Sequence, residues 1–200
     1  MALEQRQLHV VGIGGSLRPQ SNGRRALTYA LAAAEAAGAT TELLALNEWR
    51  LPMFEPGKAI EAYEPIVTDY LAVARRADAM IWCSAGYHGT ITGVAKNALD
   101  FLEFLSQDDR AYLHQRVVGL IATAAGELAA VNTINAMVHV VHALRGTVAP
   151  LFVPIGKASQ AFDADGQLTN PQIATRLEML GKLVVDTANR FRMLGVTEAD

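Results

Sequence analysis

Short runs of aliphatic residues alternate along the chain with longer segments in which apolar residues recur every three or four positions. The short runs predict strands that are buried on both faces, as the strands of a covered parallel sheet must be. We expect these five strands at Leu8–Ile13, Thr41–Leu46, Ala79–Ser84, Val117–Thr123 and Thr147–Val153. The periodic segments predict a helix after each strand, at Gly23–Ala37, Pro65–Ala77, Gly93–Leu105, Leu128–Leu144 and Pro171–Leu194. This alternation is typical of an α/β fold in three layers, with a five-stranded parallel sheet and helices on both faces.

Two connections between the predicted elements are long for a compact domain, Asn47–Glu64 and Pro154–Asn170. Connections of this size usually carry function or form an interface. Two plain surface excursions would explain them equally well, so both interpretations stay open.

Composition narrows the class of protein. The 200 residues are 51% hydrophobic and 18% charged, which excludes intrinsic disorder and fits one domain over residues 1–200. The formal net charge of −3 gives no electrostatic reason to bind nucleic acid or an anionic membrane. A single cysteine excludes an intramolecular disulfide and a zinc ribbon. The first residues lack a signal-peptide pattern, and polar residues interrupt the most apolar stretch, Val117–Leu144. We therefore expect a cytoplasmic protein without nucleic-acid or membrane partners.

The turn after the first predicted strand is rich in glycine and reads GIGGSLRPQSN over residues 12–22. It is not the dinucleotide fingerprint G-x-G-x-x-G, because Leu17 stands where a small residue is needed. It is not a hydrolase elbow G-x-S-x-G either, because Arg18 takes the place of the last glycine. No Gly-Lys pair in the chain is followed by Ser or Thr, so a Walker A loop is also excluded.

The same turn has the residues of a different phosphate-binding loop. Its glycines let backbone N–H groups converge at a helix N-terminus, where the helix dipole favours an anion. Ser16, Ser21 and Asn22 add short side-chain donors, and Arg18 adds a planar charged fork. This set suits one terminal monophosphate. The alternative is a polar turn in which Ser21 or Asn22 merely caps the first helix.

Two motifs in this order resemble the NADPH-dependent FMN reductase family, which has the flavodoxin-like fold. Residues 15–22 resemble its G-S-x-R-x-x-S-x signature. Residues 85–100 resemble its second motif, P-E-Y-N-G-S-I-P-G-x-L-K-N-A-I-D. The second motif matches at Tyr87, Gly89, Ile91, Gly93, Lys96, Asn97, Ala98 and Asp100, and departs at Ala85, Gly86, His88 and Thr92. The resemblance covers nearly the whole chain and implies FMN as cofactor and NADPH or NADH as hydride donor.

The resemblance also implies where FMN binds. Ligands of open α/β sheets bind outside the carboxyl ends of the strands, so the loops after the first, third and fourth strands should meet around the flavin. The loop Ala85–Thr92 would approach the isoalloxazine edge with its backbone, and Tyr87 would pack against the ring. The segment Thr123–Glu127 resembles the family's A-T-x-G loop. The expected cofactor-binding residues are Ser16, Arg18, Ser21, Asn22, Gly86, Tyr87, His88, Gly89, Thr123 and Gly126.

The implied chemistry is hydride transfer from the nicotinamide to flavin N5, with electrons passed on to free flavin or to a small acceptor such as a quinone. No catalytic side chain and no metal ligand is assigned. A flavodoxin-type electron carrier without pyridine-nucleotide oxidase activity is the alternative, and a nucleotide-sensing binding protein is a third class. The loops beside the expected flavin carry only one aromatic residue, Tyr87, and the net charge is modest, which favours the reductase. A flavin-dependent monooxygenase is a candidate protein partner.

Several reactive residues have plainer interpretations. Cys83 ends a buried strand and is expected to be a small buried hydrophobe rather than a redox thiol. His139 and His142 lie three residues apart on a helix without a neighbouring carboxylate, which favours a solvated or interface stripe over a metal site. His88 is either a surface loop residue or a polar neighbour of the flavin.

The helices expected at Gly93–Leu105 and Leu128–Leu144 carry more apolar surface than one sheet face can cover. In each, the polar residues form one narrow stripe. We therefore expect a two-fold homodimer through these two helices. Two such dimers could associate into a homotetramer.

Overall fold

The structure of the protein is a computed structural model that describes residues 6–197. Five parallel strands form its central sheet in the order β2-β1-β3-β5-β6. Their bounds are β1 His9–Gly15, β2 Thr40–Ala45, β3 Ala79–Tyr87, β5 Val117–Thr123 and β6 Thr147–Ile155. This is the flavodoxin-like strand order, with a switch point between β1 and β3. The predicted five-stranded parallel sheet is confirmed. A sixth strand, the two-residue β4 (Thr90–Ile91), pairs antiparallel with the end of β3 and was not predicted.

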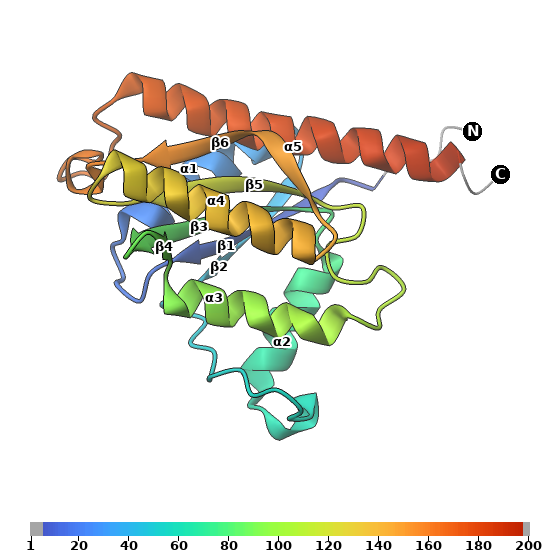
Figure 1. The fold of residues 1–200 in the computed structure, drawn as a ribbon. Helices are drawn as coiled ribbons and strands as arrows, with labels where there is room; N and C mark the ends of the chain where they lie inside the picture. The colour runs from blue at the N-terminus through green and yellow to red at the C-terminus, as the bar shows by residue number, and fades with distance from the viewer. Residues whose placement is uncertain (1–5, 198–200) are drawn as a thin grey trace.

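Helices cover both faces of the sheet, so the predicted three layers are confirmed (Figure 1). Two of them, α1 (Asn22–Ala36) and α5 (Pro171–Thr197), lie together on one face. The other three, α2 (Pro65–Arg76), α3 (Gly93–Asp100) and α4 (Glu127–Ala143), lie on the opposite face. Each observed helix begins and ends within three residues of the expected one, apart from the third.

The third helix is shorter than its apolar periodicity predicts. The α-helix α3 ends at Asp100, and a 3₁₀ helix, η2 (Phe101–Leu105), continues the chain. Two further 3₁₀ helices, η1 (Ile60–Ala62) and η3 (Ala158–Gln160), lie within the two long connections. Periodicity alone does not separate an α-helix from a short 3₁₀ extension, because both keep apolar residues on one side.

The connection between β2 and α2, residues 47–64, runs beside α2 and α3 (Figure 1), and its apolar residues pack against the core on that face of the sheet. Phe54 and Tyr63 from this segment lie edge-on against Phe101, with ring centroids 5.5 and 5.2 Å away. The Asn97 side chain on α3 accepts a hydrogen bond from Phe54 N–H and donates one to the Pro52 carbonyl, each at 2.8 Å. The 47–64 segment is therefore fixed to α3 and η2 by both apolar and polar contacts.

This packing changes the basis of the assembly hypothesis. Much of the apolar surplus expected on the third helix is buried within the chain itself, because Phe101, Leu102 and Leu105 are each 1% exposed or less. Those three residues need no partner chain to cover them. On α4, by contrast, Leu128 and Val131 remain 80% and 38% exposed. Within residues 6–197, no helix is both long and apolar enough to cross a membrane.

Candidate functional site

A cavity of about 390 Å³ opens at the carboxyl ends of β1, β3 and β5. Its walls come from the loops that follow these three strands and from the start of η3. Eight of the ten residues expected to bind cofactor line it: Ser16, Arg18, Ser21, Asn22, Gly86, Tyr87, His88 and Thr123. Three loops that are far apart in sequence thus meet at one point, where ligands of open α/β sheets bind.

The first wall is the turn over residues 15–22, for which the sequence predicts phosphate binding and which is called the phosphate loop below. The backbone leaves β1 through two glycines with positive φ, Gly14 at 149° and Gly15 at 88°. A Cβ on Gly14 would overlap the Cys83 carbonyl of the neighbouring strand, so only glycine fits there. The loop then turns through a hydrogen bond of 3.1 Å from Arg18 N–H to Ser16 Oγ. It ends at the N-terminus of α1, where the N-cap Ser21 and the first helical residues, Asn22 and Gly23, line the cavity.

Ser21 is the N-cap of α1, and its Oγ accepts a hydrogen bond of 3.1 Å from Arg24 N–H. The capping interpretation is therefore correct for this residue, but it does not exclude phosphate binding. A serine hydroxyl that accepts one hydrogen bond still has its own proton to donate. The structure thus gives Ser21 a structural task and leaves a donor facing the cavity.

Asn22 and Arg18 differ in how firmly they are held. The Asn22 amide donates to the Ala158 carbonyl and so ties α1 to η3 across the cavity. Arg18 is exposed, and within residues 6–197 no carboxylate lies within ion-pair distance of its guanidinium. An arginine at the cavity rim without a carboxylate partner retains its full capacity for an anion.

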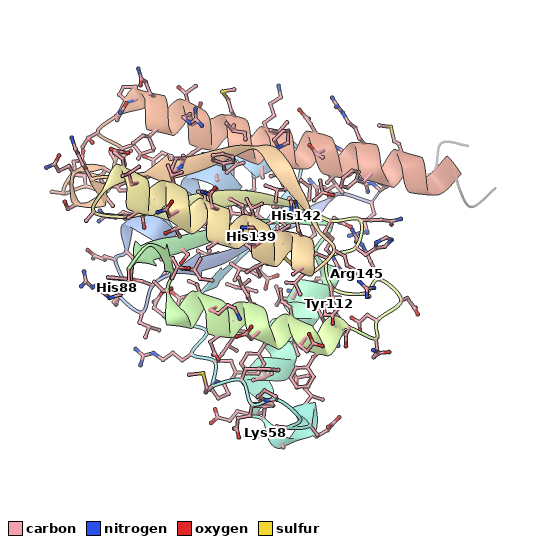
Figure 2. All side chains as sticks on the ribbon, viewed as in Figure 1. Lys58, His88, Tyr112, His139, His142 and Arg145 are labelled. Atoms are coloured by element: carbon pink, nitrogen blue, oxygen red, sulfur yellow. The ribbon has the colours of Figure 1, made fainter. Side chains whose placement is uncertain are left out.

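The second wall is the hairpin of β3 and β4. His88 and Gly89 form its two-residue turn, with φ of 53° and 81°. Positive φ at both positions is the geometry of a type I′ turn, which needs glycine or asparagine-like residues. Gly89 does not line the cavity. We therefore assign Gly89 to the turn. Figure 2 shows His88 at this end of the molecule.

Gly86 is explained by packing. A Cβ at this position would overlap the Thr133 hydroxyl of α4, so the chain carries glycine where the family motif has glutamate. Tyr87 follows it and is 56% exposed at the cavity, free to lie along a planar ligand.

The third wall follows β5. Thr123 is buried at the end of the strand, and the next residues are fixed to the loop after β6. Ala124 N–H donates to the Ile155 carbonyl and Ala158 N–H donates to the Ala124 carbonyl, each at 3.0 Å. Gly126 does not line the cavity; it is the N-cap residue of α4.

Eight lining residues were not among the expected binding residues: five small ones within or beside the expected loops, Gly15, Gly23, Ala85, Ala124 and Ala125, and three others, Gln20, Ala158 and Ser159. Ala158 and Ser159 belong to the long connection 154–170. The length of this connection was the one available sequence signal, and its residues Ala158 and Ser159 form part of the cavity wall.

Cys83 does not line the cavity; it lies in β3 close to the lining residue Gly23 and is 1% exposed. Burial raises the pKa of its thiol to about 12, so the sulfur is neutral at physiological pH. A neutral buried thiol is neither a nucleophile nor a ready redox group. The expected role as a small buried hydrophobe is confirmed.

The chemistry of the cavity fits FMN. Among the described lining residues there is one cation, Arg18, and no carboxylate, so the potential favours an anion. The phosphate loop offers serine hydroxyls and helix N–H groups at one end. The other end is bounded mostly by small residues, Ala85, Gly86, Ala124 and Ala125, which leave room for a flat ring. The volume lies within the range of sites for small molecules and cofactors.

The fold is flavodoxin-like, and the lining of this cavity is compatible with a phosphorylated flavin. The family model of NADPH-dependent FMN reductases matches residues 8–160. The chain belongs to this family. It is thus an NAD(P)H-dependent FMN reductase, an oxidoreductase with FMN as cofactor, and the flavodoxin-type carrier is not favoured.

Similar proteins agree with this assignment. An NAD(P)H-dependent FMN reductase of Pseudomonas aeruginosa is 29% identical over 169 residues, which are 80% of this chain and 84% of the relative. The NADPH-dependent FMN reductase ArsH of Shigella flexneri is 27% identical over 175 residues, 87% of this chain and 66% of the relative. The structure of FerB, an NAD(P)H:acceptor oxidoreductase from Paracoccus denitrificans, superposes with a TM-score of 0.71 at 21% identity, covering 92% of this chain and 98% of FerB. The last comparison supports the fold alone.

Proposed function

We propose that the cavity holds FMN with its phosphate in the phosphate loop and its ring between the hairpin 85–89 and the segment 123–126. Ser16, Ser21 and the first N–H groups of α1 donate to the phosphate, and Arg18 pairs with it. Asn22 keeps η3 in place beside them through its bond to Ala158. The single observation that carries this proposal is the meeting of both sequence motifs, some 60 residues apart, in one cavity.

In this site, the side chains and backbone of the protein position the cofactor and do not themselves react. FMN, when bound, accepts a hydride from the nicotinamide and passes the electrons on. Backbone N–H groups of residues 85–88 face the polar edge of the ring, and Tyr87 covers one part of it. Gly89 and Gly126 act on the shape of the two loops, through the turn and through the start of α4.

The proposal extends to the electron acceptor, the cellular location and the oligomeric state of the protein. We infer free flavin or a small acceptor such as a quinone as the electron acceptor, because the cavity is open to solvent beside the exposed Tyr87. A flavin-dependent monooxygenase would use reduced flavin released from such a site. We further infer that residues 1–200 act as one flavin-binding domain, that the protein is cytoplasmic, and that it forms a homodimer or homotetramer. The single cysteine, Cys83, is buried and forms no disulfide, and a chain without disulfides is compatible with a reducing compartment.

The direct test is nucleotide oxidation by the purified protein. An absorbance spectrum shows whether flavin is retained, and the oxidation of NADPH and of NADH is then followed with and without added FMN. We expect at least one nucleotide to be oxidised in an FMN-dependent manner. Tight FMN binding without oxidation of either nucleotide would contradict the proposal and favour an electron carrier.

A further inference from the structure

A second cavity, of about 250 Å³, lies at the opposite end of the sheet, where the strands begin. It is enclosed by the residues just before β1, β3 and β5 and by the last part of α5. Figure 1 shows that α5 runs over the sheet from the flavin end to this end. The cavity, here called the arginine pocket, is lined by Leu8, Asp78, Arg110, Gln115, Ala188, Phe191 and Arg192.

The two arginines of the arginine pocket bond to neutral groups. Arg110 Nε donates to the His114 carbonyl at 2.9 Å, and its terminal nitrogen donates to the Gln115 carbonyl at 2.8 Å. Arg192 donates to the Arg6 carbonyl and, at 3.0 Å, to Asn189 Oδ1. Within residues 6–197, neither guanidinium has a carboxylate within 4.0 Å. These bonds fix both side chains in place, and because the acceptors are neutral oxygens, each guanidinium keeps its positive charge available to an anion.

The surroundings add positive charge. Arg116 lies behind the arginine pocket, is 3% exposed, and donates only to the carbonyls of Arg75, Ala77 and Tyr112. Burial lowers its pKa to about 10, which still leaves it charged at neutral pH. A buried cation is costly to desolvate; the carboxylates of Asp108 and Asp78 offset part of that cost for Arg116, and a bound anion would lower it further.

One carboxylate lines the arginine pocket, and it is already engaged. Asp78 pairs with Arg6 at 2.6 Å through Oδ1 and accepts His9 N–H at 2.8 Å through Oδ2. The nearby Asp108 is paired with Arg75 at 2.8 Å and adds no net charge. Of the described residues that line the pocket, two are cationic, Arg110 and Arg192, and one is anionic, Asp78, which gives this lining a formal charge of +1 (two positive, one negative). Arg6, which pairs with Asp78, and the buried Arg116 lie close by.

The remaining wall is apolar. Ala188 and Leu8 are each 4% exposed, and Phe191 lies beside them on α5. A ligand that fills this space therefore has an anionic head near the guanidinium groups and a hydrocarbon body against the apolar wall.

We propose that the arginine pocket is a second binding site, which takes a small organic anion with its carboxylate or phosphate head between Arg110 and Arg192 and its apolar body against Leu8, Ala188 and Phe191. The site is separate from the flavin cavity, because the two cavities share no residue and lie at opposite ends of the strands. Its existence does not depend on the proposed function.

The test is a calorimetric titration of the protein saturated with FMN, so that the phosphate loop is already filled. Benzoate and phenyl phosphate are the probes, since they share a ring and differ in the anionic head. Benzamide is the neutral control of the same shape, and inorganic phosphate is the control without an apolar body. We expect at least one of the two organic anions to bind at least tenfold more tightly than benzamide and inorganic phosphate. Whichever head is preferred identifies the source as a carboxylate or a phosphate ester.

Matched variants locate the binding. Arg192→Ala should lower the affinity for the preferred probe about tenfold or more, because it removes a charge-assisted contact. Arg176→Ala is the control: it removes the same charge from the same helix, and Arg176 is exposed and donates to the Phe152 carbonyl away from the pocket. It should leave the affinity unchanged.

The sign of the effect can also be reversed. Asp78→Asn keeps an oxygen for His9 N–H and removes the one negative charge of the pocket wall, so it should tighten binding of the anion severalfold. Absence of saturable binding by both anions, equal binding of benzamide, or equal losses in Arg192→Ala and Arg176→Ala would each overturn the proposal.

Discussion

At the scale of single residues, His88 occupies a motif position that has to satisfy both the geometry of a turn and the lining of a cavity. It is the first residue of the β3–β4 turn, with φ of 53°, and it also lines the flavin cavity. Left-handed backbone costs most residues energy, and asparagine tolerates it better than histidine. The family motif has asparagine at this position, so we expect the histidine of this chain to make the turn less stable than asparagine would.

Exchanging this residue separates the two requirements. His88→Asn should raise the free energy of unfolding by about 0.5 kcal/mol, because it relieves the turn. His88→Val, with a β-branched side chain at positive φ, should lower it by about 1–2 kcal/mol. Chemical denaturation measures both changes. If His88 also contacts the flavin, FMN affinity falls in His88→Asn although stability rises; unchanged affinity assigns His88 to the turn alone.

At the scale of elements, the 47–64 segment is the least expected feature. Its aromatic residues fill the space over α3 and η2, and Asn97 fastens its backbone at two points. Asn97 belongs to the motif that resembles the reductase family, but its contacts in this structure are structural. The motif residue serves the flavin site only by holding the scaffold beside it.

Asn97→Ala tests this role. The substitution leaves Phe54 N–H and the Pro52 carbonyl without their side-chain partner, which should cost about 1–3 kcal/mol of stability. Hydrogen exchange should increase within residues 47–64, while FMN affinity stays within about twofold. Lys96→Ala is the matched control, since the neighbouring Lys96 is exposed and pairs only with Asp100 four residues on. Equal exchange in both variants would contradict the assigned role of Asn97.

Most elements could be predicted because burial leaves a simple pattern. The five parallel strands are aliphatic on both faces, and the observed ends lie within three residues of the expected ones. β3 continues to Tyr87 beyond the expected Ser84, because Gly86 and Tyr87 pair with β4 in the hairpin, a tertiary contact without a local signal. Two-residue β4 and the 3₁₀ helices are too short for periodicity to reveal.

The sequence motifs identify the loops that form the candidate site, so the residues of those loops could be predicted. Eight of ten expected residues line the cavity, and the two that do not, Gly89 and Gly126, shape the loops beside it. Ala158 and Ser159 could not be named from the sequence, because only the closure of the β6 loop over β5 brings them there.

At the scale of the whole molecule, α4 presents the surface that the chain itself leaves open. Leu128 and Val131 lie exposed on this helix beside the end that carries the flavin cavity. His139 and His142 continue the outer line of α4 toward its other end (Figure 2). A dimer through α4 would cover the apolar positions, and its two-fold axis would set two flavin cavities on one assembly.

Light scattering at micromolar concentration should therefore give at least twice the mass of the chain. Val131→Asp places a charge on the proposed interface and should shift the protein toward monomer. Met179→Asp, at a residue 55% exposed on α5 on the opposite face, should leave the assembly intact. A stable wild-type monomer, or equal dissociation of both variants, would contradict a dimer through α4.

The central claim, that the phosphate loop holds the phosphate of FMN, is tested most directly by titrating FMN and riboflavin into the wild-type protein and Arg18→Ala. Riboflavin is the matched ligand, because it lacks only the phosphate. Loss of a charge-assisted contact worth about 1.5–3 kcal/mol should weaken FMN by roughly tenfold to more than a hundredfold. Riboflavin affinity and stability should hardly change, since Arg18 is exposed at the rim. Ser21→Ala should differ by also losing about 1 kcal/mol of stability, as the N-cap of α1. Equal losses for FMN and riboflavin in Arg18→Ala would show that Arg18 does not bind the phosphate.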